Sequence, residues 1–162
     1  MSYDKKYFKW CASQKKGIRL VKESENLQKA YTKKSNEALK SMDVNAKAGI
    51  NEWTISTSYY AKYFAIYALL SRIGIKCEIH DCTIALFGHL FGDVIPQTFI
   101  QNLKQAKEDR IDAQYYTTEI RIDYSELIRN TKDFVLKIEE IIDSLNPKKI
   151  LDIRKELKTM CN

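Results

Sequence analysis

Two residues, His80 and Arg110, carry the side chains best suited to chemistry on a phosphate group. The histidine is one of only two in the chain, and it shares a helical stripe with Ile84 and Phe87. An imidazole titrates near neutral pH, so it can act as a general base or bind phosphate. Arg110 interrupts an inward-facing helical row, where a guanidinium needs an anionic partner. Together they suffice for metal-independent RNA cleavage: the histidine takes the 2′-hydroxyl proton and the arginine stabilises the transition-state charge.

Each of these residues also has a structural interpretation. The histidine could stand at a helix start and bond to the backbone. The arginine could pair with Asp109, Asp112 or a carboxylate of a neighbouring helix. Tyr115 and Tyr116 follow one turn later, and their hydroxyls could contact phosphate, or their rings could pack in a core. The sequence alone leaves these alternatives open, as it does the question of whether the histidine and the arginine meet in space.

The sequence indicates no bound metal and no cofactor. It contains no phosphate-cradling glycine loop, no serine nucleophile elbow and no helix-borne metal motif. Residues 77–82 include two cysteines, a glutamate and a histidine, but the second ligand cluster that a zinc site needs is missing. We interpret the four dispersed cysteines as reduced structural thiols: Cys11, Cys77, Cys82 and Cys161.

Composition favours a helical protein of one domain. The chain has 162 residues, 44% hydrophobic and 30% charged, and five glycines with two prolines leave little material for the turns of an all-β fold. No apolar run is long enough to span a bilayer and the start lacks a signal peptide, so we expect a cytoplasmic protein with no membrane contact. The net charge of +6 permits affinity for nucleic acid without requiring it.

The element that must position the candidate residues is a helix over residues 53–74, which carries only two charged side chains. A helix that is apolar almost all round sits centrally in a larger packing. We expect one face in the core and the other in a subunit interface. The two apolar stripes are Trp53, Tyr60, Phe64 and Tyr67, and Ile55, Tyr59, Ile66, Leu70 and Ile73.

The remaining periodicity predicts further helices around this one. We expect Ser24 to cap the helix at 25–42, a loop at 43–51, a stop at Gly74, and Pro147 to begin the last helix. The pattern indicates an all-α antiparallel bundle of four to five main helices with peripheral N- and C-terminal helices. The other helices are predicted at residues 3–13, 78–91, 97–120 and 123–145, with an extended stretch at 18–21.

Three groups of residues resemble the HEPN superfamily of helical domains, and the branch labelled UPF0332 in particular. They are Ser58-Tyr59-Tyr60-Ala61-x-Tyr63-Phe64-Ala65-x-x-Ala68-Leu69-Leu70 with Gly74, then His80 and Phe87, then Arg110-x-x-Ala113-x-Tyr115-Tyr116. The resemblance covers about residues 24–145 of a single domain over 1–162. Residues 1–23 are expected to be an N-terminal extension that packs on the bundle or on a partner, with Trp10 as its anchor.

The resemblance implies a homodimer that acts with a minimal nucleotidyltransferase in a toxin–antitoxin pair. Many members are metal-independent RNases with an arginine followed, after four to six residues, by a histidine. Here Tyr115 stands after four residues and no histidine follows, which favours nucleotide or RNA binding over cleavage. The expected binding residues are Arg110, Asp112, Tyr116, His80 and Tyr60, and in the alternative of an RNase toxin the expected catalytic residues are Arg110, Tyr115 and His80.

Overall fold

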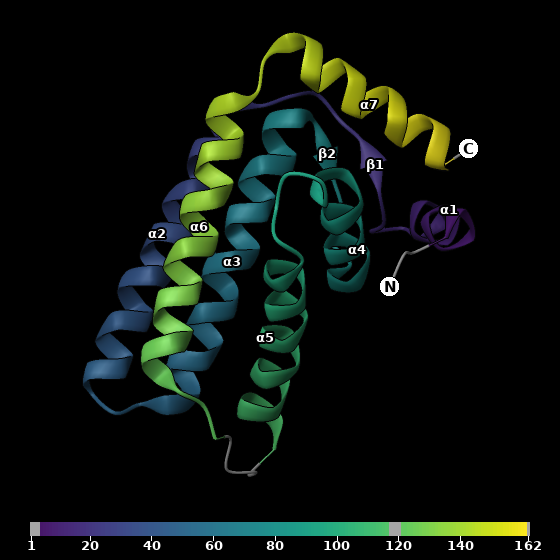
Figure 1. The fold of residues 1–162 in the computed structure, drawn as a ribbon. Helices are drawn as coiled ribbons and strands as arrows, with labels where there is room; N and C mark the ends of the chain where they lie inside the picture. The colour runs from purple at the N-terminus through teal and green to yellow at the C-terminus, as the bar shows by residue number, and fades with distance from the viewer. Residues whose placement is uncertain (1–3, 117–120, 162) are drawn as a thin grey trace.

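The computed structural model describes residues 4–116 and 121–161, and within them the chain forms seven α-helices and two short β-strands (Figure 1). The helical architecture predicted from the sequence is confirmed. In chain order the elements are α1 (Lys5–Ser13), β1 (Arg19–Leu20), α2 (Glu25–Lys47), α3 (Asn51–Ile73), β2 (Ile75–Lys76), α4 (His80–Phe91), α5 (Gln97–Tyr115), α6 (Tyr124–Ser144) and α7 (Pro147–Cys161).

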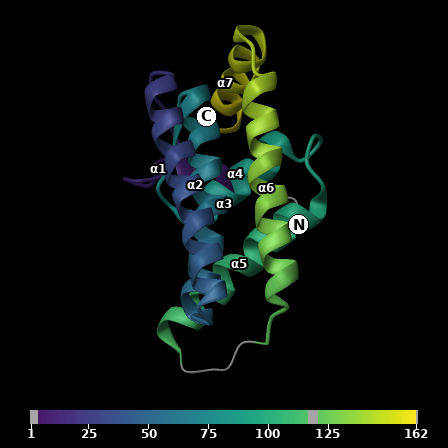
Figure 2. The same cartoon turned by 90° about the vertical axis from the view of Figure 1, so that its left-hand side faces the viewer.

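Helix α3 forms the centre of the bundle, with α2, α5 and α6 packed along it (Figures 1 and 2). The four long helices α2, α3, α5 and α6 alternate in direction along the chain (Figure 1). Fifteen of the 23 residues of α3 are buried, including the predicted stripe through Ile55, Tyr59 and Ile66. The other stripe stays at the surface: Trp53 is 56% exposed and Tyr60 is half-buried. The helix is therefore covered on one side and accessible on the other.

Gly74 ends α3 in the left-handed conformation, with a φ of 77°. A side chain at this position would collide with Arg154 of α7. That arginine donates through Nη1 to the carbonyl oxygens of Val21 at 3.0 Å, Ile73 at 2.8 Å and Gly74 at 2.8 Å. Because the last carbonyls of a helix lack partners within it, this guanidinium caps α3 and holds α7 across its end.

Two helix boundaries differ from the sequence prediction. Helix α2 continues to Lys47, through the first half of the predicted loop. Asp43 pairs with Lys132 of α6 at 2.9 Å and Met42 is fully buried, so tertiary contacts hold this segment helical. Helix α5 ends at Tyr115, and the rest of its predicted length includes residues 117–120, which lie outside the described residues.

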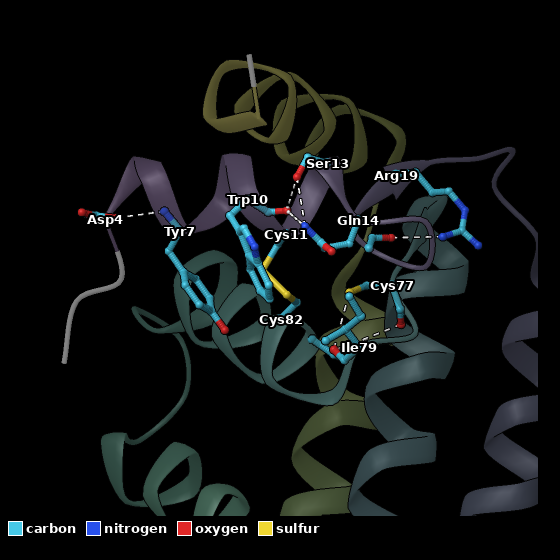
Figure 3. Close-up of a disulfide and its surroundings, with 12 residues drawn as sticks. Asp4, Tyr7, Trp10, Cys11, Ser13, Gln14, Arg19, Cys77, Ile79 and Cys82 are labelled. Atoms are coloured by element: carbon cyan, nitrogen blue, oxygen red, sulfur yellow. Dashed lines mark hydrogen bonds between the residues drawn. A yellow bond between two sulfur atoms is a disulfide. The ribbon is translucent and has the colours of Figure 1, made fainter.

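A disulfide between Cys11 and Cys82 attaches α1 to α4 (Figure 3). The prediction of four reduced thiols is therefore wrong, and only Cys77 and Cys161 are free. The bonded pair is separated by 71 residues in sequence, and their Cα atoms are 5.8 Å apart. This proximity arises from tertiary packing, which the spacing of the cysteines does not reveal.

Trp10 does not anchor the N-terminal helix α1 to the bundle. Its indole is 51% exposed, whereas Phe8 is 1% exposed and Cys11 is fully buried. A nine-residue helix is too short to be stable alone in water. Phe8 and the disulfide therefore hold α1 on the bundle.

No helix within residues 4–116 and 121–161 is both long and apolar enough to cross a bilayer.

Candidate functional site

The guanidinium of Arg110 lies between α5 and α3. Its Nη1 donates to Tyr60 Oη at 3.2 Å and to Gln114 Oε1 at 3.1 Å. Its Cζ lies 5.4 Å from the centre of the Tyr59 ring and 5.7 Å from that of Tyr60. Both distances are within the range of a cation–π interaction. The inward direction predicted for this arginine is thus observed, and aromatic rings surround it.

No carboxylate neutralises Arg110 among the described residues. The ion pairs of this part of the chain do not include it, so the alternative of internal pairing with Asp109 or Asp112 is not observed. Its Nε is buried and has no hydrogen-bond partner. Since a guanidinium has five N–H donors in a planar fork, most of the donor capacity of this group is unused.

His80 begins α4 and lies against two tyrosines of α3. Its Nδ1 is 2.5 Å from Tyr59 Oη, and its ring stacks on that of Tyr63 with centroids 4.1 Å apart. Burial lowers the pKa of His80, and the nearby charges of Arg110 and Lys107 lower it further. The structure therefore brings His80 and Arg110 to the same tyrosine, Tyr59. The alternative of a backbone hydrogen bond at the helix start is not observed.

The phenol of Tyr59 determines which nitrogen of His80 carries the proton. Tyr59 is fully buried, and burial raises its pKa far above neutral, so it keeps its proton at neutral pH. We therefore assign Tyr59 as the donor and Nδ1 of His80 as the acceptor. The imidazole is then neutral with its hydrogen on Nε2. In this form His80 presents a donor, which suits an anion better than it suits proton abstraction.

Lys107 adds a second cation on the same face of α5, one turn before Arg110. Its Nζ pairs with Asp81 at 2.7 Å and with Glu108 at 3.2 Å, and its side chain is 17% exposed. Asp81 follows His80 in α4, so this pair joins α5 to the helix that carries the histidine. The i, i+3 spacing of Lys107 and Arg110 was a signal in the sequence that could have identified the lysine.

Not all the predicted site residues meet. Arg110, His80 and Tyr60 come together around Tyr59, which the sequence analysis did not name among the site residues. Tyr115 and Tyr116 are 72% and 60% exposed at the end of α5. Asp112 is exposed as well. Within the described ranges, no hydrogen bond, ion pair or ring contact joins these last three side chains to the cluster.

In the described part of the chain, no group of three His, Cys, Asp or Glu residues is placed to hold a metal ion. The potential metal ligands of residues 77–82 make other contacts. Cys82 is in the disulfide, and Glu78 pairs with Arg19 at 2.8 Å.

The sequence of the chain matches one protein family, described as the HEPN domain, over residues 28–156. The match runs from α2 into α7 and includes every residue of the cluster around Arg110. No curated protein matches the chain.

Proposed function

Because the chain belongs to the HEPN domain family, we propose that its Arg110 cluster binds the phosphate groups of a nucleotide or an RNA. The observation that carries this proposal is a partly buried guanidinium with no carboxylate and with an unpaired Nε. A buried charge is stable only when paired. Two oxygens of a phosphate can accept two parallel hydrogen bonds from the planar fork of a guanidinium.

The surroundings of Arg110 support an anionic ligand. His80 contributes an N–H donor in its assigned tautomer. Lys107 lies on the same helix face, but Asp81 and Glu108 already pair with it, so Arg110 is the cation available to the ligand. Tyr59 and Tyr60 hold the guanidinium from the α3 side. The site is thus rigid before the ligand arrives, which reduces the entropy lost on binding.

Replacement of Arg110 by glutamine tests this proposal. We expect the Arg110→Gln variant to bind a fluorescently labelled single-stranded RNA roughly ten- to hundredfold more weakly, since hydrogen bonds to charged groups contribute about 1.5–3 kcal/mol. Fluorescence anisotropy at fixed low salt gives the two dissociation constants. The matched control is Arg129→Gln, which removes the same charge from the exposed face of α6. Equal losses in both variants would mean that net charge alone binds RNA, and an unchanged Arg110→Gln would contradict the proposal.

A second candidate function is metal-independent RNA cleavage. The observation in its favour is that a neutral imidazole and an arginine converge on Tyr59. The assigned tautomer of His80 argues against cleavage. Its Nδ1, the nitrogen without a hydrogen, already accepts a hydrogen bond from Tyr59. In addition, Tyr115 stands where active relatives are expected to have histidine. We therefore rank binding above cleavage.

We expect the wild-type protein to leave RNA intact in the presence of a chelator. Incubation with RNAs of varied sequence and gel separation of the products provide the measurement. Cleavage that disappears in both Arg110→Gln and His80→Ala would reverse the ranking. Cleavage that persists in both variants would indicate a contaminating nuclease.

We also propose that the protein assembles as a homodimer and acts with a nucleotidyltransferase partner of a toxin–antitoxin pair. Membership of the HEPN domain family supports this assembly. A mass of one chain by light scattering at high concentration would contradict the dimer. The assignment to the UPF0332-type branch stays a prediction.

A further inference from the structure

A cavity of about 320 Å³ lies between α3 and α5, next to the Arg110 cluster. Helix α3 contributes Glu52, Trp53 and Ser56 to its lining, and α5 contributes Ala113, Gln114 and Tyr115. Trp53, Ser56 and Tyr60 recur along one face of α3 at helical spacing, and Tyr60 contacts Arg110. The cavity and the cluster are therefore neighbours between α3 and α5, and Gln114 belongs to both.

Two large aromatic side chains at this cavity are exposed. Trp53 of α3 is 56% exposed and Tyr115 of α5 is 72% exposed. Each helix thus presents one flat ring to the same cavity, and neither ring is covered by the described chain. Flat aromatic surfaces of this kind bind flat rings by stacking, and successive bases of single-stranded nucleic acid stack on them whatever their sequence.

The cavity also holds polar groups that lack partners. Ser56 is 1% exposed, and its Oγ has no hydrogen-bond partner. The Oε1 of Gln114 accepts from Arg110, and within the described residues its Nε2 has no acceptor. A buried hydroxyl without a partner is destabilising. A ligand with an acceptor beside a flat ring would pair with Gln114 Nε2, whereas the chain itself covers Ser56 Oγ.

Gln114 connects this cavity to the cationic cluster. It lines the cavity and contacts Arg110 Nη1 at 3.1 Å. Tyr115 lies five positions after Arg110, which is about 7.5 Å along the axis of a helix. A single nucleotide bound by its phosphate at Arg110 can therefore reach the aromatic rings with its base.

We propose that the cavity between Trp53 and Tyr115 binds one unstacked nucleobase of the nucleotide or RNA whose phosphate Arg110 holds. This inference rests on the proposed phosphate binding. It adds a part of the ligand, the base, and it assigns one residue, Trp53, that neither the motif nor the charge pattern indicated.

The fluorescence of Trp53 tests the proposal directly. The chain has two tryptophans. In a Trp10→Phe variant, Trp53 is therefore the sole indole. We expect adenosine monophosphate and guanosine monophosphate to quench its emission by stacking. Ribose 5-phosphate has the same phosphate and no base, so it should bind without quenching. Equal quenching by all three compounds, or no quenching at saturating nucleotide, would overturn the base site.

Binding of labelled single-stranded RNA of mixed sequence gives the second readout. We expect Trp53→Ala and Tyr115→Ala each to weaken the affinity roughly five- to hundredfold, the range for loss of one stacked base. Trp10→Ala, which removes an exposed indole on α1, should bind like wild type. Both replaced rings are exposed, and circular dichroism verifies that the helices remain.

The two proposals fail separately. If Arg110→Gln loses binding while Trp53→Ala and Tyr115→Ala keep it, the phosphate site stands and the base site is wrong. If Arg110→Gln keeps wild-type affinity, the proposed function itself is wrong, whatever the aromatic variants do.

Discussion

Replacement of both Cys11 and Cys82 by alanine is expected to lower the free energy of unfolding by about 4 kcal/mol, the loop-closure estimate for a bond of this span. The two cysteines are separated by 71 residues, so in the unfolded chain the bond removes much conformational freedom. In the folded protein it joins a short α1 to α4, and both sulfur-bearing residues are fully buried. Urea unfolding followed by far-ultraviolet circular dichroism measures the change.

The matched control for this experiment is Cys161→Ala, which removes a thiol but no bond. We expect a much smaller loss of stability from it. Wild-type protein unfolded with a reducing agent should behave like the double variant, and the double variant should not respond to the reducing agent. Four alkylated thiols in unfolded, unreduced protein would contradict the bond.

Helix boundaries set by local residues could be predicted from the sequence. Ser24 caps α2 through a hydrogen bond from the backbone N–H of Leu27, and Pro147 begins α7, as predicted. Gly74 ends α3 because only a residue without a side chain fits beneath Arg154. Each of these signals acts within a few residues of chain. The predicted loop after Met42 was wrong because the ion pair that keeps it helical comes from α6.

The candidate site was only partly predictable for the same reason. The helical period placed Arg110 on an inward face, and composition made His80 conspicuous. That both converge on Tyr59 depends on how α4 and α5 pack against α3, which no spacing encodes. Tyr59 belonged to one of the two predicted stripes of the central helix, and the stripe does not reveal that its buried phenol also fixes the imidazole. The disulfide and the cavity at Trp53 depend on the same packing.

Lys62 is a charged residue of the central helix α3 that the structure buries. Its side chain is 2% exposed. It lines a cavity between α5 and α6 that also includes Asp109. Burial lowers the pKa of Lys62 to about 8, although the charge of Asp109 acts in the opposite direction. The folded protein therefore holds this ammonium less favourably than water does.

We expect Lys62→Met to raise the free energy of unfolding by about 3 kcal/mol at pH 7, since a methionine fills similar space without a charge. Below pH 8 the lysine is charged in both states, so the full destabilisation is present. Between pH 8 and the ordinary lysine pKa of 10.5, the folded state releases the proton first, and wild-type stability rises toward that of the variant. Urea unfolding across this pH range therefore should show a difference that shrinks as pH rises, with the exposed Lys29→Met as a control near zero. A variant less stable than wild type at pH 7, or a difference independent of pH, would mean that the ammonium is paired in the folded protein.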